Sequence, residues 1–147
     1  LADYTLNIQR KGYPSPSASV NTHPDSLYQA IDGRIWYFPE ISNYWSTTGS
    51  TSNSDWFAID FEQTREITMA NIYLYADGKT FDIPDSLGIE YQRGGKWLPV
   101  IIKERKPVKL IGNTVNTMII DKVIASRIRI NFKHTAKQVA LVELECY

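Results

Sequence analysis

Short segments in which apolar and polar residues alternate are the feature that most constrains the fold of this chain. In residues 87–92, the apolar side chains of Leu87, Ile89 and Tyr91 are separated by Gly88, Glu90 and Gln92. A period of two residues is typical of a strand that buries one face. The same period recurs in residues 4–8, 72–76, 128–133 and 142–145, and the runs 56–61 and 115–120 have the composition of strands. Short strands separated by turns predict an all-β, antiparallel sandwich or barrel.

Only one helical segment is expected beside these strands. Asp25 can cap a short helix that places Leu27, Ala30 and Ile31 on one face. Residues 93–96, Arg-Gly-Gly-Lys, favour a tight hairpin turn. Three of the tryptophans, Trp45, Trp56 and Trp97, are assigned to the hydrophobic core because large aromatic side chains are usually packing residues.

Length and charge limit the classes of protein that the chain can represent. The 147 residues are expected to form a single domain, 1–147. Lys plus Arg and Asp plus Glu each number 16, so the chain lacks the basic footprint of a nucleic-acid binder. No apolar run approaches the ~20 residues that span a bilayer, so no membrane span is expected. Because the sequence begins at Leu1 and shows no signal peptide, we expect it to be a piece of a longer protein.

The sequence shows none of the common catalytic motifs. His23 and His134 are far apart, and Cys146, the only cysteine, lies next to the terminus and cannot form an internal disulfide. No Gly-rich phosphate loop, His-Glu-x-x-His or Gly-x-Ser-x-Gly motif is present. We therefore expect a domain without catalytic activity, and we interpret His23, which precedes Pro24, as loop structure.

Two stretches combine aromatic and charged residues outside the expected strands. The first contains three consecutive aromatic residues, Trp36, Tyr37 and Phe38, and Pro39 would stiffen it. The second, residues 77–81, combines Asp77 and Lys79 with Phe81. Sugars offer apolar C–H faces ringed by hydroxyls, so a sugar site needs aromatic platforms and directed hydrogen-bonding groups. The alternative is that the aromatic rings are packing residues and that Asp77 and Lys79 form a solvated turn.

A series of short motifs occurs in an order that resembles a known family. The motifs are Ser17-Ala18-Ser19, Ala30-Ile31-Asp32-Gly33, Trp45-Ser46, Trp56 to Phe61, Tyr91 to Val100, Ser126 to Ile130 and Ala140 to Glu145. Their order resembles the discoidin, or coagulation factor 5/8 type C, family, which overlaps with galactose-binding-like carbohydrate-binding modules of family 32. The resemblance covers the chain after Lys11 and implies a jelly-roll β-sandwich of about eight strands. In the animal coagulation-factor members a disulfide ties the ends of the domain together. This chain cannot form one, so it is more similar to a bacterial module.

The resemblance also implies a metal site. In this family a calcium ion often joins the Asp-Gly loop to a Glu of the last strand, which makes Asp32 and Glu143 the candidate ligands, with Asn43 where the family often has Thr. Calcium takes six to eight oxygen ligands, most of which backbone carbonyls can supply. The alternative is that Asp32 closes a turn, while Glu143 is solvated or pairs with Arg34.

The resemblance further implies that the binding loops gather at one end of the sandwich. The candidate ligand site then consists of residues from three loops: Trp36, Tyr37, Phe38, Asp77, Lys79, Phe81 and His134. For His134 the alternative is an ordinary surface histidine.

These observations together predict a non-catalytic carbohydrate-binding module. Its partners would be a glycan and a parent catalytic domain in the same chain, with the module an accessory of a secreted or surface glycoside hydrolase. The location would be extracellular, at the cell surface or periplasmic. The alternative is a structural module that docks on its parent enzyme and binds no sugar; a protein- or lipid-binding adhesion module is a third, less favoured interpretation.

Overall fold

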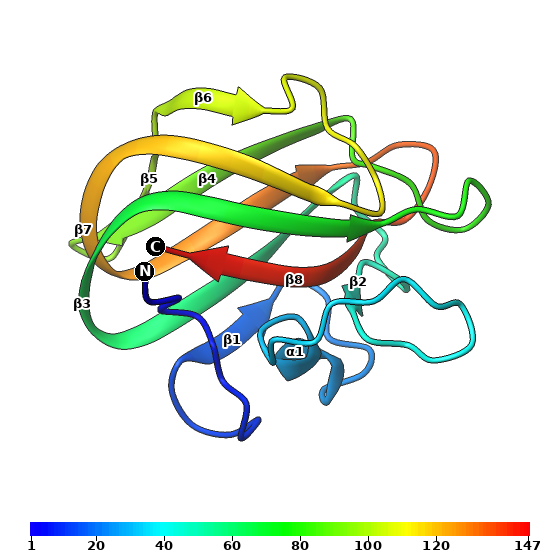
Figure 1. Ribbon diagram of the computed structural model, residues 1–147, viewed down its shortest axis with the longest axis horizontal. Helices are drawn as coiled ribbons and strands as arrows, with labels where there is room; N and C mark the ends of the chain where they lie inside the picture. The colour runs from blue at the N-terminus through cyan, green and yellow to red at the C-terminus, as the bar shows by residue number, and fades with distance from the viewer.

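The computed structural model describes residues 1–147, which form eight β-strands and one short helix (Figure 1). The strands pair only in antiparallel fashion, and the helix is four residues long. The elements in chain order are β1 (Ser15–Ala18), α1 (Ser26–Gln29), β2 (Trp45–Ser46), β3 (Ser54–Tyr75), β4 (Ser86–Arg93), β5 (Lys96–Pro99), β6 (Ile102–Lys106), β7 (Val115–Lys133) and β8 (Ala140–Cys146). The predicted all-β, antiparallel fold of about eight strands is confirmed.

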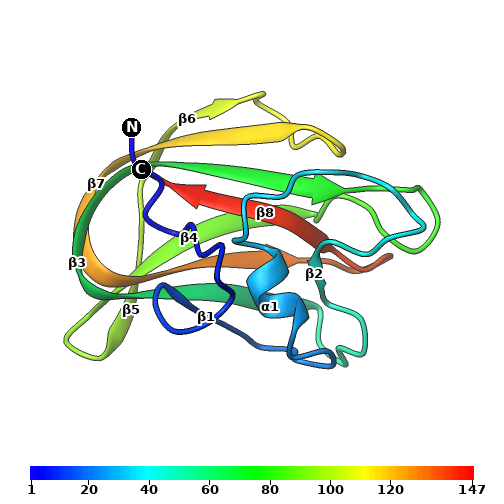
Figure 2. The ribbon, with the colours of Figure 1, turned by 60° about the horizontal axis from the view of Figure 1, so that its bottom comes forward.

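Two long strands, β3 and β7, belong to both layers of the sandwich. They pair along most of their length, with register shifts between Asp60 and Arg65 and between Ile67 and Met69. At these shifts both strands curve round one end of the molecule, as Figure 2 shows at its left-hand side. One layer therefore contains β1, the first half of β3, the second half of β7, β4 and β5. The other contains β2, β8, the second half of β3, the first half of β7 and β6.

The core lies between the two layers and is built from alternate residues of each strand. In β3, Phe57 and Ile59 are buried, and in β7 the buried residues are Ile128, Ile130 and Phe132. Each such side chain contributes roughly 1.5–3 kcal/mol by leaving water. The alternation that predicted the strands therefore also identifies which side chains fill the core.

Among the tryptophans assigned to the core, only Trp45 lies there. Its ring is 1% exposed and packs against Phe57 and Phe132, with centroids 5.4 and 6.1 Å away. Trp56 and Trp97 are half-buried outside the core cluster, so this part of the prediction is wrong. The physical reason is the two-residue period, because Phe57 points inward and its neighbour Trp56 must then point to the outer face.

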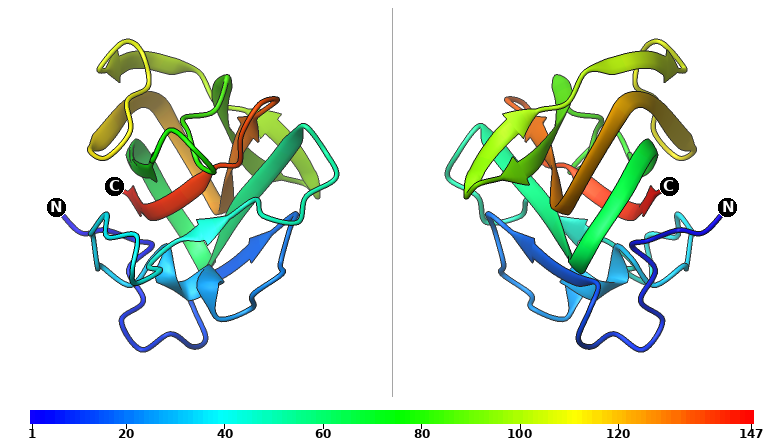
Figure 3. Two further views of the ribbon diagram at one scale, coloured as in Figure 1. Left: turned by 90° about the vertical axis from the view of Figure 1, so that its right-hand side faces the viewer. Right: turned by 90° about the vertical axis from the view of Figure 1, so that its left-hand side faces the viewer.

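The first predicted strand, residues 4–8, is not a strand but a turn-rich segment that runs beside the end of β8. Thr5 and Asn7 are buried there, whereas Leu6 and Ile8 are 40% and 71% exposed, the reverse of the expected orientation. The buried polar groups are satisfied, since Thr5 Oγ1 donates to the Leu144 carbonyl at 2.7 Å and the Asn7 N–H to the Ile31 carbonyl at 2.8 Å. The segment places the two chain termini side by side (Figures 1 and 3).

The helix is shorter than its apolar residues suggested. It ends at Gln29, and Ala30 and Ile31, both fully buried, follow it. The Asp25 side chain makes no capping hydrogen bond, so the predicted cap is wrong. Four residues are too few to cross a membrane, and the chain has no other helix.

Candidate functional site

The loops that carry the predicted ligand residues do meet at one end of the sandwich. The loop between β3 and β4 contains Asp77, Lys79 and Phe81, and it lies against the loop between β7 and β8. The Gln138 N–H donates to the Thr80 carbonyl at 3.0 Å, and the Asp82 N–H to the Gln138 carbonyl at 3.1 Å. These bonds fix the two loops to each other, so this end of the molecule is a rigid surface.

Phe81 and Tyr37 pack within this surface rather than standing on it. Phe81 is 8% exposed and forms a small cluster with Tyr75, Ala140 and Val142, which Tyr37 covers. Burial also raises the pKa of the Tyr37 hydroxyl, whose oxygen has no hydrogen-bond partner. Tyr37 was a candidate platform and Phe81 a candidate pocket residue, and for both rings the structure favours the alternative that they are packing residues.

His134 begins the loop between β7 and β8, as predicted, but its side chain is buried, so it is neither an exposed ligand residue nor an ordinary surface histidine. It is 6% exposed, and its Nε2 lies 2.7 Å from Oδ2 of Asp55, which is also buried. Asp55 accepts further hydrogen bonds from the hydroxyls of Ser19 and Ser50, at 2.7 and 2.6 Å. His134 thus ties the end of β7 to the start of β3.

Asp77 closes a turn, as the alternative interpretation held. Its Oδ1 accepts backbone N–H groups from Lys79, Thr80 and Phe81 at 2.9, 3.0 and 3.0 Å. These bonds lower the pKa of Asp77 because they favour the ionised carboxylate. Lys79 remains exposed at the tip of the same turn.

Of the three consecutive aromatic residues, only Phe38 presents a free ring. It is 61% exposed, whereas Trp36 is half-buried and donates its indole N–H to the Ile41 carbonyl at 3.3 Å. The structure therefore brings the three predicted loops to one end, and of the predicted ligand residues it leaves Phe38, Asp77 and Lys79 exposed.

A cavity lies beside these loops, between α1 and β2. It has a volume of about 460 Å³ and is called here the α1–β2 pocket. Its lining residues are His23, Asp25, Ser26, Gln29, Ser42, Tyr44, Ser46 and Thr48.

One wall of the α1–β2 pocket follows from alternation through β2. Asn43, Trp45 and Thr47 are buried, at 3%, 1% and 0% exposure. The residues between and beside them, Ser42, Tyr44, Ser46 and Thr48, consequently face the cavity. The other wall comes from α1 and the segment before it, which supply an imidazole, a carboxylate, a hydroxyl and an amide.

Tyr44 is the single aromatic residue of the pocket, and its ring is held in place from behind. It stacks on Tyr75 with centroids 6.0 Å apart and planes 8° from parallel, and it meets Phe81 edge-on at 5.2 Å. A fixed aromatic ring among groups that donate and accept hydrogen bonds suits a polyhydroxylated ligand. None of the predicted ligand residues lines this pocket, although the polar residues that alternate with Trp45 are a sequence signal for it.

The predicted metal ligands Asp32, Asn43 and Glu143 each bond to the backbone of Gly33 or Arg34. Asp32 is 5% exposed and accepts the Arg34 N–H at 3.0 Å and the Arg10 guanidinium at 3.1 Å. The Asn43 side-chain amide donates to the Arg34 carbonyl. The side chain of Arg10, rather than that of Arg34, is thus the cation in this cluster, and it pairs with Asp32.

Glu143 is fully buried, and one of its oxygens has no partner. Oε2 accepts the Gly33 N–H at 2.8 Å, while Oε1 makes no hydrogen bond. Burial, followed by the charges of Asp32, Asp3 and Glu145, raises the pKa of Glu143 to about 9. An unpartnered buried carboxylate oxygen beside a second carboxylate fits a hard cation such as calcium. No three His, Cys, Asp or Glu side chains gather closely enough to hold a metal, so backbone carbonyls would have to supply the other ligands.

The fold and its polar pocket define a β-sandwich of the class that includes carbohydrate-binding modules. The F5/8 type C domain model matches residues 15–144, and the chain belongs to this family. The resemblance to the discoidin family is thereby confirmed. No curated protein sequence matches the chain.

Several solved structures, among them carbohydrate-binding modules, are similar in fold. A chain from the Streptococcus pneumoniae β-galactosidase BgaA superposes with a TM-score of 0.86 at 18% identity, covering 99% of this chain and 98% of that one. A chitosan-binding module from a Paenibacillus chitosanase/glucanase has a TM-score of 0.72 at 15% identity, covering 100% and 99%. The family 32 module of Clostridium perfringens NanJ, solved with galactose, has a TM-score of 0.69 at 20% identity, covering 90% and 91%.

Proposed function

We propose that this chain is a non-catalytic carbohydrate-binding module whose glycan occupies the α1–β2 pocket. The observation that carries the proposal is the wall of alternate residues through β2, in which the ring of Tyr44 stands among hydroxyl groups. A sugar ring stacks its C–H face on Tyr44, and its hydroxyls bond to groups such as Asp25 and Gln29 on the opposite wall. Membership of the F5/8 type C family and similarity to sugar-binding modules support this proposal.

The module acts by keeping an attached enzyme close to its substrate. One pocket of this size buries a single sugar or a short chain end, so the affinity of the isolated module is low. Covalent attachment to a glycoside hydrolase converts weak binding into a high effective concentration of glycan. The place of action in this proposal is outside the cytoplasm, where such glycans are exposed.

Calcium is the proposed structural cofactor. Glu143 Oε1 would ligate it, with Asp32 nearby and with loop carbonyls completing the shell. Its role is to neutralise the buried carboxylates and to hold the Asp32-Gly33 loop against β8, which positions the start of the loop leading to Tyr44.

Calorimetric titration of the isolated module tests the glycan site. The titrants are galactose, N-acetylglucosamine and their oligomers, and the variants are Tyr44→Ala and Asp25→Ala. Loss of the ring removes about 1–3 kcal/mol of stacking, which corresponds to a ten- to a hundredfold weaker affinity. Phe38→Ala is the matched control, because it removes an exposed ring outside the pocket.

Two results would contradict this proposal. If Phe38→Ala abolishes binding while the pocket variants bind normally, the ligand lies on the aromatic loop. If the wild-type module binds none of these glycans, the structural docking module is the better account.

A further inference from the structure

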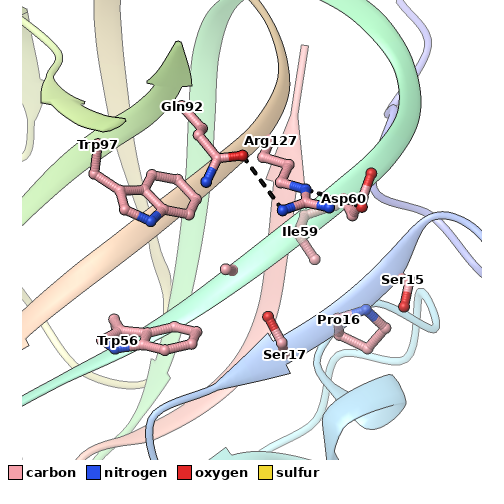
Figure 4. A pocket seen from close by; sticks show the side chains of 10 residues that line it. Ser15, Pro16, Ser17, Trp56, Ile59, Asp60, Gln92, Trp97 and Arg127 are labelled. Atoms are coloured by element: carbon pink, nitrogen blue, oxygen red, sulfur yellow. Dashed lines mark hydrogen bonds and ion pairs between the residues drawn. The ribbon is translucent and has the colours of Figure 1, made fainter. Parts of the chain in front are cut away.

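A second cavity lies on the outer face of the layer formed by β1, β3, β7, β4 and β5. Its volume is about 350 Å³, and it is called here the sheet-face cleft (Figure 4). The side chains that matter for its chemistry are Trp56, Ala58, Asp60, Gln92, Trp97 and Arg127. None of them lines the α1–β2 pocket, so the two cavities are separate.

The hollow exists because a small residue stands between two larger ones on the same strand. Trp56, Ala58 and Asp60 occupy alternate positions of β3 and therefore share the outer face. The methyl group of Ala58 leaves open space that any larger side chain would fill. In Figure 4 the rings of Trp56 and Trp97 lie on one side of this space, Arg127 and Asp60 lie on the other, and Gln92 lies between Trp97 and Arg127.

The two tryptophan rings are held in position by one guanidinium group. The Arg129 guanidinium carbon lies 4.4 Å from the Trp97 ring centroid and 5.6 Å from that of Trp56. Arg129 is fixed by Glu90 at 2.8 Å, and Asn131 donates to the same carboxylate oxygen at 2.6 Å. Rings that are ordered before binding lose little entropy when a ligand stacks on them.

The polar side of the cleft is ordered and electrically neutral. Arg127 Nε donates to Asp60 Oδ2 at 3.0 Å, and its Nη1 donates to the Gln92 side-chain oxygen at 3.3 Å. Since Arg129 is paired with Glu90, both arginines already have carboxylate partners. An anionic ligand would have to compete with these carboxylates, whereas hydroxyl groups can bond to them without breaking the pairs.

We propose that the sheet-face cleft is a second glycan-binding site, which takes neutral oligosaccharides and is independent of the α1–β2 pocket. One sugar unit stacks on Trp97 or Trp56, and its hydroxyls bond to Asp60, Arg127 and Gln92. The cleft differs from an apolar docking patch because one of its walls consists of paired hydrogen-bond donors and acceptors. Two sites on one module would let it bind two chains of the same polysaccharide.

Tryptophan fluorescence distinguishes this site from the α1–β2 pocket, which no tryptophan lines. Titration of the wild-type module with neutral galactose or N-acetylglucosamine oligomers should change its emission, and calorimetry should give two sites per chain. Ala58→Leu fills the floor of the cleft while keeping both rings. It should remove the emission change and weaken this site about ten- to a hundredfold. Trp97→Ala should do the same.

Matched variants and ligands complete the experiment. Tyr44→Ala should abolish only the pocket site and leave the emission change, so failure of one proposal is distinguishable from failure of the other. Phe38→Ala should alter neither site, and acidic oligogalacturonates should bind the cleft at least tenfold more weakly than neutral oligomers. The proposal is overturned if folded Ala58→Leu keeps two sites and the emission change. It is also overturned if acidic chains bind the cleft better than neutral oligomers do.

Discussion

The environment of Glu143 is far from that of a free side chain. Its carboxyl group is fully buried, and its pKa is raised to about 9, chiefly by burial. The folded state therefore holds a proton that the unfolded chain has released across the range from about pH 4.5 to 9. Because the folded state binds more protons in this range, stability must fall as the pH rises through it.

Replacement of Glu143 by Gln isolates this effect. Gln is uncharged at every pH, and its carbonyl can still accept the Gly33 N–H, so the melting temperature of Glu143→Gln should vary less above pH 5. Melting curves of both proteins in EDTA measure this. Parallel curves from pH 5 to 9 would show that Glu143 does not titrate as its burial requires.

Calcium that binds at Glu143 should raise the melting temperature, whereas a rise in pH should lower it. A cation that binds only the folded state raises the melting temperature, and it competes with the proton on Glu143. Added calcium should therefore stabilise the wild type, more at pH 8 than at pH 6, and EDTA should reverse this. No calcium response in the wild type, or the same response in Glu143→Gln, would leave Arg10 as the only cation of this cluster.

His134 offers a second test at the scale of a residue, because a ligand role and a structural role predict different results. His134→Ala removes a charge-assisted hydrogen bond to buried Asp55, which should cost about 1.5–3 kcal/mol of stability. Urea unfolding measures the loss, and the surviving folded protein should bind glycan with unchanged affinity. Lost glycan binding with unchanged stability would restore His134 as a ligand residue.

At the scale of the elements, the curvature of β3 and β7 makes two layers from one continuous set of strands. The bend of β3 contains Glu62, whose φ of 69° lies in the left-handed region, and its N–H is bonded to Asp60 Oδ1 at 2.8 Å. For a residue with a side chain this conformation costs roughly 1–2 kcal/mol. The bend of β3, which lets the strand join both layers, therefore includes a strained residue.

Glycine substitutions should report this strain. Glu62→Gly should leave stability unchanged within about 0.5 kcal/mol or raise it, because relief of strain offsets the greater freedom of the unfolded chain. Gln63→Gly, at the exposed neighbouring residue without a positive φ, should lose about 0.5–1 kcal/mol. Equal losses in urea unfolding of the two variants would argue against strain at Glu62.

For the whole molecule, local patterns predicted the layers well because the two-residue period is a property of each strand by itself. The same patterns misplaced residues 4–8, since burial of Thr5 and Asn7 depends on hydrogen bonds to Leu144 and Ile31, far along the chain. The size of Trp56 predicted a core position. Its neighbour Phe57 points into the core, however, so the two-residue period of the strand places Trp56 on the outer face.

The candidate site was harder to predict because its groups converge only in three dimensions. The family resemblance pointed to Asp32, Asn43 and Glu143, which all bond to the backbone of residues 33–34, and it implied that the binding loops gather at one end. It could not show that Phe81 and Tyr37 pack together, or that Tyr44 is held by Tyr75 and Phe81. The sheet-face cleft is likewise lined by residues from five strands, which no single segment of sequence contains.

The central claim is that this β-sandwich binds glycans through cavities on its surface. The most direct measurement is the shift of backbone amide NMR signals during titration with neutral galactose and N-acetylglucosamine oligomers. Shifts should concentrate in residues 23–29 and 42–48 around the α1–β2 pocket, and in residues 56–60 and 92–97 around the sheet-face cleft. A titration that shifts no amide with any of these glycans, or shifts only residues 36–38 and 77–79, would contradict the account.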